Sequence, residues 1–248
     1  MAHERILVVT AHPDDVDFGA AGSVARWVRE GASVTYCIVT DGDAGASPPG
    51  VPRDEVPRLR RAEQTAAAKV LGVSDLVWLG YSDGQVTASL ELRRDISRVI
   101  RQVRPSRVVC QSSERNLDRL FASHPDHLAA GEATICAVYP DARNPFAFPE
   151  LMEAGLEPHV VEEVLIMAAG DLDHFVDITE TFPHKVAALA AHVSQTEHHE
   201  DLEGMIRGWS EGVARLGGLP EGRLAEGFRR VETGERPPRA RPPAPGER

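Results

Sequence analysis

Residues 6–15 have the sequence Ile-Leu-Val-Val-Thr-Ala-His-Pro-Asp-Asp, and this stretch decides the predicted fold. Its first four residues are apolar and mostly β-branched, which is typical of a buried strand. The strand leads into His12, Asp14 and Asp15, and a helical pattern begins near Phe18. This order places the three side chains at the carboxyl edge of a sheet, where open α/β folds bind ligands. Adjacent carboxylates repel each other unless a cation lies between them, so we expect a metal site.

A second polar cluster supplies the ligand that the first one lacks. Residues 123–127, Ser-His-Pro-Asp-His, follow a predicted strand at 107–110. A hydrolytic zinc site usually has three protein ligands and leaves one position for water. His12 and Asp15 offer two ligands, and one histidine of the second cluster offers the third. Either cluster alone also fits a polar turn at a helix N-terminus, but two such turns after two strands favour a metal site.

The two clusters resemble the paired motifs of the PIG-L/LmbE-like family of zinc-dependent N-deacetylases. The matching stretches are Ala-His-Pro-Asp-Asp at 11–15 and His-Pro-Asp-His at 124–127, within a resemblance that covers most of residues 5–200. Weaker matches are residues 60–63, 79–84 and 176–179. Many family members have a glutamate after the first motif, where this chain has Val16, and we do not assign that glutamate's role to Asp17.

The pattern of strands and helices predicts an α/β fold. Strands are expected at 5–10, 33–39, 75–79, 107–110, 163–168 and 175–178. Helices are expected at 18–30, 58–71, 89–103, from Pro125 onward, at 183–195 and, in a polar form, around 200–231. This alternation predicts a Rossmann-like, mostly parallel sheet with helices on both faces, in a single domain over residues 1–233. The Pro/Arg-rich residues 234–248 are predicted to be a disordered tail.

Composition excludes several classes of partner. Hydrophobic residues make up 42% and charged residues 26% of the chain, as in ordinary globular proteins. The net charge of −11 argues against nucleic acid and against anionic membrane surfaces. The first strand begins too early for a signal peptide, and three cysteines without a CxxC motif indicate a reducing compartment. We therefore expect a cytoplasmic protein; the sequence leaves open whether it forms a homo-oligomer.

The resemblance implies a hydrolase that removes an N-acetyl or similar N-acyl group from an amino sugar or a related small conjugate. It implies one Zn²⁺ per chain, held by His12, Asp15 and His127. Zinc acidifies water and polarises a carbonyl, while a carboxylate that is not a ligand can accept the proton. Asp14 fits this role because Asp15 is the ligand, and the resemblance assigns a protonated imidazole to His124.

Supporting roles are expected for three further residues. Asp126 is expected to orient His124 and to favour its charged form. The resemblance places Arg60 at the substrate pocket, although Arg60 also has the spacing for a surface ion pair with Glu63. Asp83 could accept a sugar hydroxyl, although it also fits a turn. The irregular stretches 40–57 and 140–158 are expected to decide which N-acyl compound binds. His174 is the first alternative for a further site histidine.

Other classes of protein fit less well. A dinucleotide-binding Rossmann protein needs GxGxxG, which Gly19 and Gly22 do not form, and the aspartates would repel a pyrophosphate. A non-catalytic metal-binding protein would need the ligands but not Asp14. A metallophosphoesterase commonly needs two metals and more ligands than this chain offers. Another metal-dependent amidohydrolase of natural-product tailoring remains an alternative.

Overall fold

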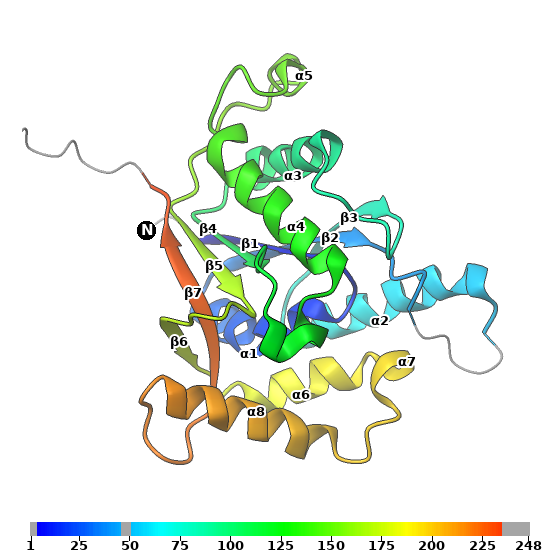
Figure 1. The fold of residues 1–248 in the computed structure, drawn as a ribbon, viewed down its shortest axis with the longest axis vertical. Helices are drawn as coiled ribbons and strands as arrows, with labels where there is room; N and C mark the ends of the chain where they lie inside the picture. The colour runs from blue at the N-terminus through cyan, green and yellow to red at the C-terminus, as the bar shows by residue number, and fades with distance from the viewer. Residues whose placement is uncertain (1–3, 46–50, 235–248) are drawn as a thin grey trace, which may run out of the picture.

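β1 (Arg5–Thr10) contributes to two hydrophobic cores, one on each face of the sheet. Ile6 and Val8 pack into one core, and Leu7 and Val9 pack into the other. A strand that is apolar on both faces has to be covered by helices on both sides. The computed structural model, which describes residues 4–45 and 51–234, has this three-layer arrangement (Figure 1).

Within the described residues the sheet has seven strands in the order β3-β2-β1-β4-β5-β7-β6. β1 to β5 run parallel, and β7 is antiparallel to both of its neighbours. The strands besides β1 are β2 (Ser33–Thr40), β3 (Asp75–Tyr81), β4 (Arg107–Gln111), β5 (Glu163–Met167), β6 (His174–Asp177) and β7 (Ala225–Glu232). The predicted mostly parallel α/β sheet is confirmed.

Helices cover both faces of the sheet (Figure 1). One face carries α1 (Asp15–Arg29), α2 (Val56–Val70), α6 (Phe182–Ala190) and α8 (Leu202–Leu216). The other face carries α3 (Leu90–Val103) and α4 (Pro125–Cys136). Shorter elements are η1 (Arg53–Glu55), η2 (Leu117–Ala122), η3 (Ala137–Asp141), α5 (Pro149–Glu153) and α7 (Val193–Thr196). No helix of the described residues has the length and apolar character needed to cross a membrane.

The topology brings the two sequence motifs together. From β1 the chain moves outward to β2 and β3, and then returns to β4 on the other side of β1. The carboxyl ends of β1 and β4 therefore lie side by side at a topological switch point. The Ala11 N–H donates to Gln111 Oε1 at 2.9 Å and joins these two ends. The residues after both strands consequently share one site.

Helix α4 approaches β4 closely because of one glycine. A Cβ at Gly131 would lie 2.4 Å from the carbonyl oxygen of Gln111, so a larger residue would push the helix away. His127 lies one turn before Gly131 on the same face of α4. This close packing therefore holds His127 near the end of β4.

The sequence prediction is wrong for the C-terminal helix. The helix expected around 200–231 ends at Leu216, and the chain returns as β7 between β5 and β6. The inward residues of β7 include Glu226, which is buried, and this charge obscures the apolar alternation of a strand. The helix expected at 183–195 is divided into α6 and α7. Of the predicted tail, 234–248, only Gly234 lies within the described residues.

The stretch 140–158 lies away from the site, contrary to our expectation. The Arg101 guanidinium, near the end of α3, donates to carbonyl oxygens at 141, 142, 144, 147 and 156. The Pro158 carbonyl accepts from Arg104, directly before β4 begins. These contacts fix the stretch at the amino edge of the sheet, so it cannot shape a site at the carboxyl edge.

A buried ion pair fastens β7 to the rest of the fold. Lys185 Nζ lies 2.6 Å from Glu226 Oε1, and both side chains are less than 5% exposed. Glu226 also accepts from the N–H groups of Gly22 and Ser23 in α1. The pair therefore connects α1, α6 and β7.

We predict that Lys185→Ala lowers the free energy of unfolding by about 3 kcal/mol, because it leaves a buried carboxylate without its cation. Urea denaturation of both proteins measures this difference. The double variant Lys185→Met/Glu226→Gln should recover most of the loss, since it removes both charges. A single variant as stable as the parent protein would show that the pair does not fasten β7.

Candidate metal centre

Three potential ligand atoms converge where β1 and β4 end. His12 Nδ1 lies 3.2 Å from His127 Nε2 and 3.4 Å from Asp15 Oδ2. His127 Nε2 lies 3.0 Å from Asp15 Oδ1. In a tetrahedral zinc site with bonds of 2.0–2.1 Å, the ligand atoms are about 3.3 Å apart. The two imidazole nitrogens have this spacing from each other, and each also has it from one oxygen of the Asp15 carboxylate.

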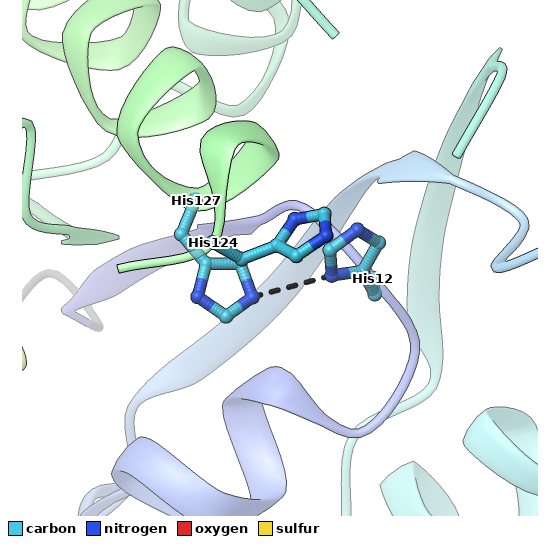
Figure 2. A group of neighbouring side chains, drawn as sticks. All are labelled: His12, His124 and His127. Atoms are coloured by element: carbon cyan, nitrogen blue, oxygen red, sulfur yellow. Dashed lines mark hydrogen bonds between the residues drawn. The ribbon is translucent and has the colours of Figure 1, made fainter. Parts of the chain in front are cut away.

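The ring nitrogen of each imidazole that points away from the cluster has an acceptor for its proton, so the converging nitrogen is the one that can bind a metal. Figure 2 shows that His12 comes from the segment after β1 and His127 from the start of α4. His12 Nε2 lies 3.2 Å from Asp126 Oδ2, and a carboxylate only accepts, so this nitrogen carries the proton. His127 Nδ1 likewise donates to the Ala122 carbonyl at 3.3 Å. Metal-binding histidines are typically oriented in this way by a partner on the other ring nitrogen.

Two other groupings of ligand atoms lie close together. One joins His12, His124 and His127, and the other joins His12, Asp83 and Asp126. The second grouping uses His12 Nε2, and Asp126 is already the acceptor for backbone N–H groups at Gly84 and Val86. A metal bound by His12, His124 and His127 would lie beside the Asp15 carboxylate without a bond to it. The set of His12, Asp15 and His127 keeps the contact of His12 Nε2 with Asp126 and brings the Asp15 carboxylate to the metal, although Asp15 Oδ2 also accepts from the backbone N–H of His12.

The electrostatics of the cluster favour a positive charge at His12. Burial opposes protonation of His12, but Asp15, Asp126 and Asp83 together raise its pKa to about 12. The pKa of Asp15 is held well below its usual value by His127 and His12, against the effect of burial. The carboxylates are therefore stabilised by a positive charge at this point. Protons on the imidazoles or a divalent metal can supply that charge.

Asp14 adopts a left-handed backbone conformation next to the ligands, with φ of 87°. Such strain in a residue other than glycine is held by surrounding contacts and is common at functional sites. The Asp14 N–H donates to Gln64 Oε1 at 2.8 Å, and Asp14 Oδ2 lies 3.0 Å from Arg60 Nη2. Burial raises the pKa of Asp14 to about 7, although the Arg60 guanidinium acts in the opposite direction. A carboxyl of this pKa suits proton transfer near neutral pH.

Arg60 faces Asp14 and is 4% exposed. Its Nη2 also donates to the Pro13 carbonyl, and its Nη1 donates to the carbonyl of Gly42. Gly42 has φ of +67°, and a Cβ there would overlap the guanidinium. Arg60 does not form the alternative surface pair with Glu63, which accepts from Ser194 instead. Its observed contacts make Arg60 a partner of Asp14, and the expected substrate contact of Arg60 stays a prediction.

His124 lies beside the ligands, but Asp126 does not orient it through its carboxylate. The ring centroids of His124 and His12 are 5.0 Å apart (Figure 2). The Asp126 carboxylate contacts His12, and only the backbone N–H of Asp126 reaches His124, donating to Nδ1 at 3.2 Å. Burial and the charge on His12 lower the pKa of His124 below its usual value, although Asp126 opposes this. This direction runs against the expectation that His124 stays protonated at neutral pH.

Asp83 and the loop after β2 form the polar side of the site. Asp83 Oδ1 lies 3.2 Å from His12 Nε2. Its Oδ2 accepts from the Ala44 N–H, and its own N–H donates to Asp43. Asp43 and Ala44 of the expected 40–57 loop therefore contact the site. Residues 46–50 of this loop lie outside the described residues.

Three buried residues that support Asp14 were missed by the sequence analysis. Gln64 Nε2 donates to Asp17 Oδ2, which also lies 2.8 Å from His192 Nε2. His192 and Asp17 are fully buried, and this contact turns the chain inward between α6 and α7. The burial of Asp17 could have been predicted, because Asp17 lies on the apolar stripe of α1, three residues before Ala20. His174 instead lies near Phe228, on β6.

Comparison with known proteins gives one family and similar structures. The family model described as "PIG-L: GlcNAc-PI de-N-acetylase" matches residues 7–138. The diacetylchitobiose deacetylase of Thermococcus kodakarensis is 31% identical over 92% of this chain and 83% of its own. The "Probable N-acetyl-alpha-D-glucosaminyl L-malate deacetylase 2" of Bacillus anthracis is 32% identical over 79% of this chain and 83% of its own. The structure of N,N'-diacetylchitobiose deacetylase from Pyrococcus horikoshii with an inhibitor superposes with a TM-score of 0.84, at 27% identity, over 92% of this chain and 84% of that one.

We predict that His127→Ala weakens zinc binding at least tenfold, because it removes one of three protein ligands, while His124→Ala retains one zinc per chain. Elemental analysis after dialysis against a weak chelator gives the zinc content of both variants, and circular dichroism checks their fold. The two histidines lie three residues apart and are matched controls for each other. Zinc retained in His127→Ala and lost in His124→Ala would contradict this ligand set.

Proposed function

Because the chain belongs to the PIG-L family of de-N-acetylases, we propose that it is a zinc-dependent hydrolase that removes an N-acetyl group from an amino sugar or a related small conjugate. The observation that carries this proposal is the geometry around Asp14. Asp14 lies next to three convergent ligand atoms and has a pKa raised by burial to about 7. A protein that only stores or senses a metal would have no use for such a group.

We propose Zn²⁺ as the metal because two imidazoles and one carboxylate are a common donor set of hydrolytic zinc sites. His12, Asp15 and His127 would hold it. Zinc in such a site acidifies water and polarises a carbonyl group. Asp126 and the Ala122 carbonyl keep the two imidazoles in the tautomers that this binding requires.

Asp14 serves as the base in this proposal. Its carboxylate accepts a proton from the attacking water and can pass that proton to the nitrogen that leaves. Arg60 has two effects on this step. It holds the carboxylate through Nη2, and it lowers the pKa of Asp14, so that a usable fraction is ionised near neutral pH.

His124 serves as a hydrogen-bond donor to the oxygen of the tetrahedral intermediate. Its Nδ1 accepts from the Asp126 N–H, so in the neutral ring the proton resides on Nε2. A neutral donor agrees with the lowered pKa of His124. Preorganised donors of this kind are worth about 10²–10³ in the catalytic constant. The leaving nitrogen then takes its proton from Asp14 instead of from His124.

The direct test is release of a primary amine from N-acetylated sugars. The relatives named above suggest a panel of diacetylchitobiose and N-acetylglucosaminyl malate, with the acetamido-glucosyl inositol named for the Kineococcus radiotolerans deacetylase as a third substrate. Amine detection with zinc-loaded protein should show turnover of at least one of the three. Absence of amine release from every member, by protein with full zinc occupancy, would contradict the proposal.

We predict that Asp14→Asn binds zinc as the parent protein does and loses about 10²–10⁴-fold in the catalytic constant, since it keeps the size of the side chain and removes its basicity. Steady-state kinetics and elemental analysis on the same sample measure the two properties. Turnover close to that of the parent protein would exclude Asp14 as the base.

We predict that Arg60→Gln shifts the acidic limb of the pH–rate profile to higher pH. The rate rises as pH rises through the pKa of Asp14, because the base has to be ionised, and Arg60 lowers that pKa. The catalytic constant at pH 7 should therefore fall more than the constant at pH 9. Arg58→Gln, on the exposed side of the same helix, is the control and should leave the limb in place. An unshifted limb in Arg60→Gln would show that another group sets it.

A further inference from the structure

A cavity of about 360 Å³ begins at the ligands Asp15 and His127 and extends between α1, α8 and β7. Most of its wall is apolar, and the apolar side chains are Phe18, Met167, Leu172, Ile206, Trp209 and Val213. They come from α1, from β5 and the segment after it, and from α8. The cavity is thus an apolar space that opens onto the proposed metal centre.

The two buried charged groups in the wall, Lys185 and Glu226, bind each other. Lys185 Nζ donates to Glu226 Oε1 and to the carbonyl oxygens of Asp17 and Phe18, which uses its three protons. Glu226 accepts from Lys185 and from two N–H groups of α1. The buried pair therefore offers no charge to a ligand, and Arg119, which also lines the cavity, is an exposed side chain. The buried part of the cavity thus suits an uncharged, apolar group.

A polar region and an apolar region lie on opposite sides of the proposed metal ligands. His12 Nδ1 faces Asp15 and His127, which line the cavity, whereas His12 Nε2 faces Asp83 and Asp126, which do not. An N-acylated sugar also has two sides, because the sugar is polar and the acyl chain is apolar. With the scissile amide at the metal, the sugar fits the side of Asp83 and the acyl chain fits the cavity.

We propose that this cavity is an acyl-chain site, and that the enzyme hydrolyses N-acyl amino sugars whose acyl group is longer than acetyl, with about four to eight carbons. This inference rests on the proposed function and names its substrate class more closely. A methyl group needs about the volume of a water molecule, roughly 30 Å³, so an acetyl group alone would leave most of the 360 Å³ unfilled. Each additional buried methylene favours binding about fourfold.

The test compares N-acetyl-, N-butyryl- and N-hexanoylglucosamine as substrates of the zinc-loaded protein. Ser210, which is 4% exposed on α8, lines the cavity, and Ser210→Phe would fill part of it. Val213→Phe, at a less buried position of the cavity wall, is a second variant should the first fail to fold. Glu211→Phe adds the same side chain on the exposed side of α8 and is the matched control.

The proposal expects kcat/KM for the hexanoyl compound to equal or exceed that for the acetyl compound. The hexanoyl-to-acetyl ratio should fall at least about tenfold in Ser210→Phe or Val213→Phe and stay unchanged in Glu211→Phe. Rejection of the hexanoyl compound by the parent protein, or a ratio unaffected by either cavity variant, would overturn the acyl-chain site while deacetylation itself stands.

Calorimetric titration with hexanoate gives a readout that does not depend on turnover. Should none of the three compounds be hydrolysed, the panel of N-acetylated sugars given above still decides the proposed function. Hexanoate binding that is present in the parent protein and lost in Ser210→Phe would then still support the cavity as an acyl site. Hexanoate that does not bind the parent protein, or that binds both proteins equally, would overturn it.

Discussion

The proposed metal centre depends on an excess of negative charge at the carboxyl edge of the sheet. Asp14, Asp15, Asp83 and Asp126 all lie within reach of His12 or its neighbours, where burial removes the screening by water. Such a group of carboxylates is stable only when a cation lies among them. Protons on the imidazoles or a divalent metal can supply that charge, and only the metal gives the site hydrolytic chemistry. The ligand geometry and the roles proposed for Asp14 and His124 all depend on this requirement.

The two parts of the chain contribute differently to the proposed enzyme. The segment matched by the family model, 7–138, contains the proposed ligands together with Asp14 and His124. The later segment supplies most of the cavity wall, through α8 and β7, and also His192, which supports Asp14 through Asp17 and Gln64. Chemistry and selectivity for the acyl group are therefore carried by different elements. The buried pair of Lys185 and Glu226 connects these elements across α1.

The sequence predicts the elements better than it predicts the contacts between side chains. The parallel strands follow from apolar runs, and the convergence of His12 with His127 follows from two motifs that end neighbouring parallel strands. β7 could not be found in this way, because its buried Glu226 is compensated by a lysine distant in the chain. The sequence also could not show which side chain the Asp126 carboxylate contacts. Which imidazole its carboxylate reaches depends on how closely α4 approaches β4, and the structure gives His12.

The central claim is that the cation at this edge is held by His12, Asp15 and His127. Diffraction from crystals of zinc-loaded protein, recorded on both sides of the zinc absorption edge, tests it most directly. The account predicts one anomalous peak per chain, about 2.0–2.2 Å from His12 Nδ1, His127 Nε2 and an Asp15 carboxylate oxygen. A peak bonded to His124 in place of Asp15, or one between His12 Nε2, Asp83 and Asp126, would contradict it.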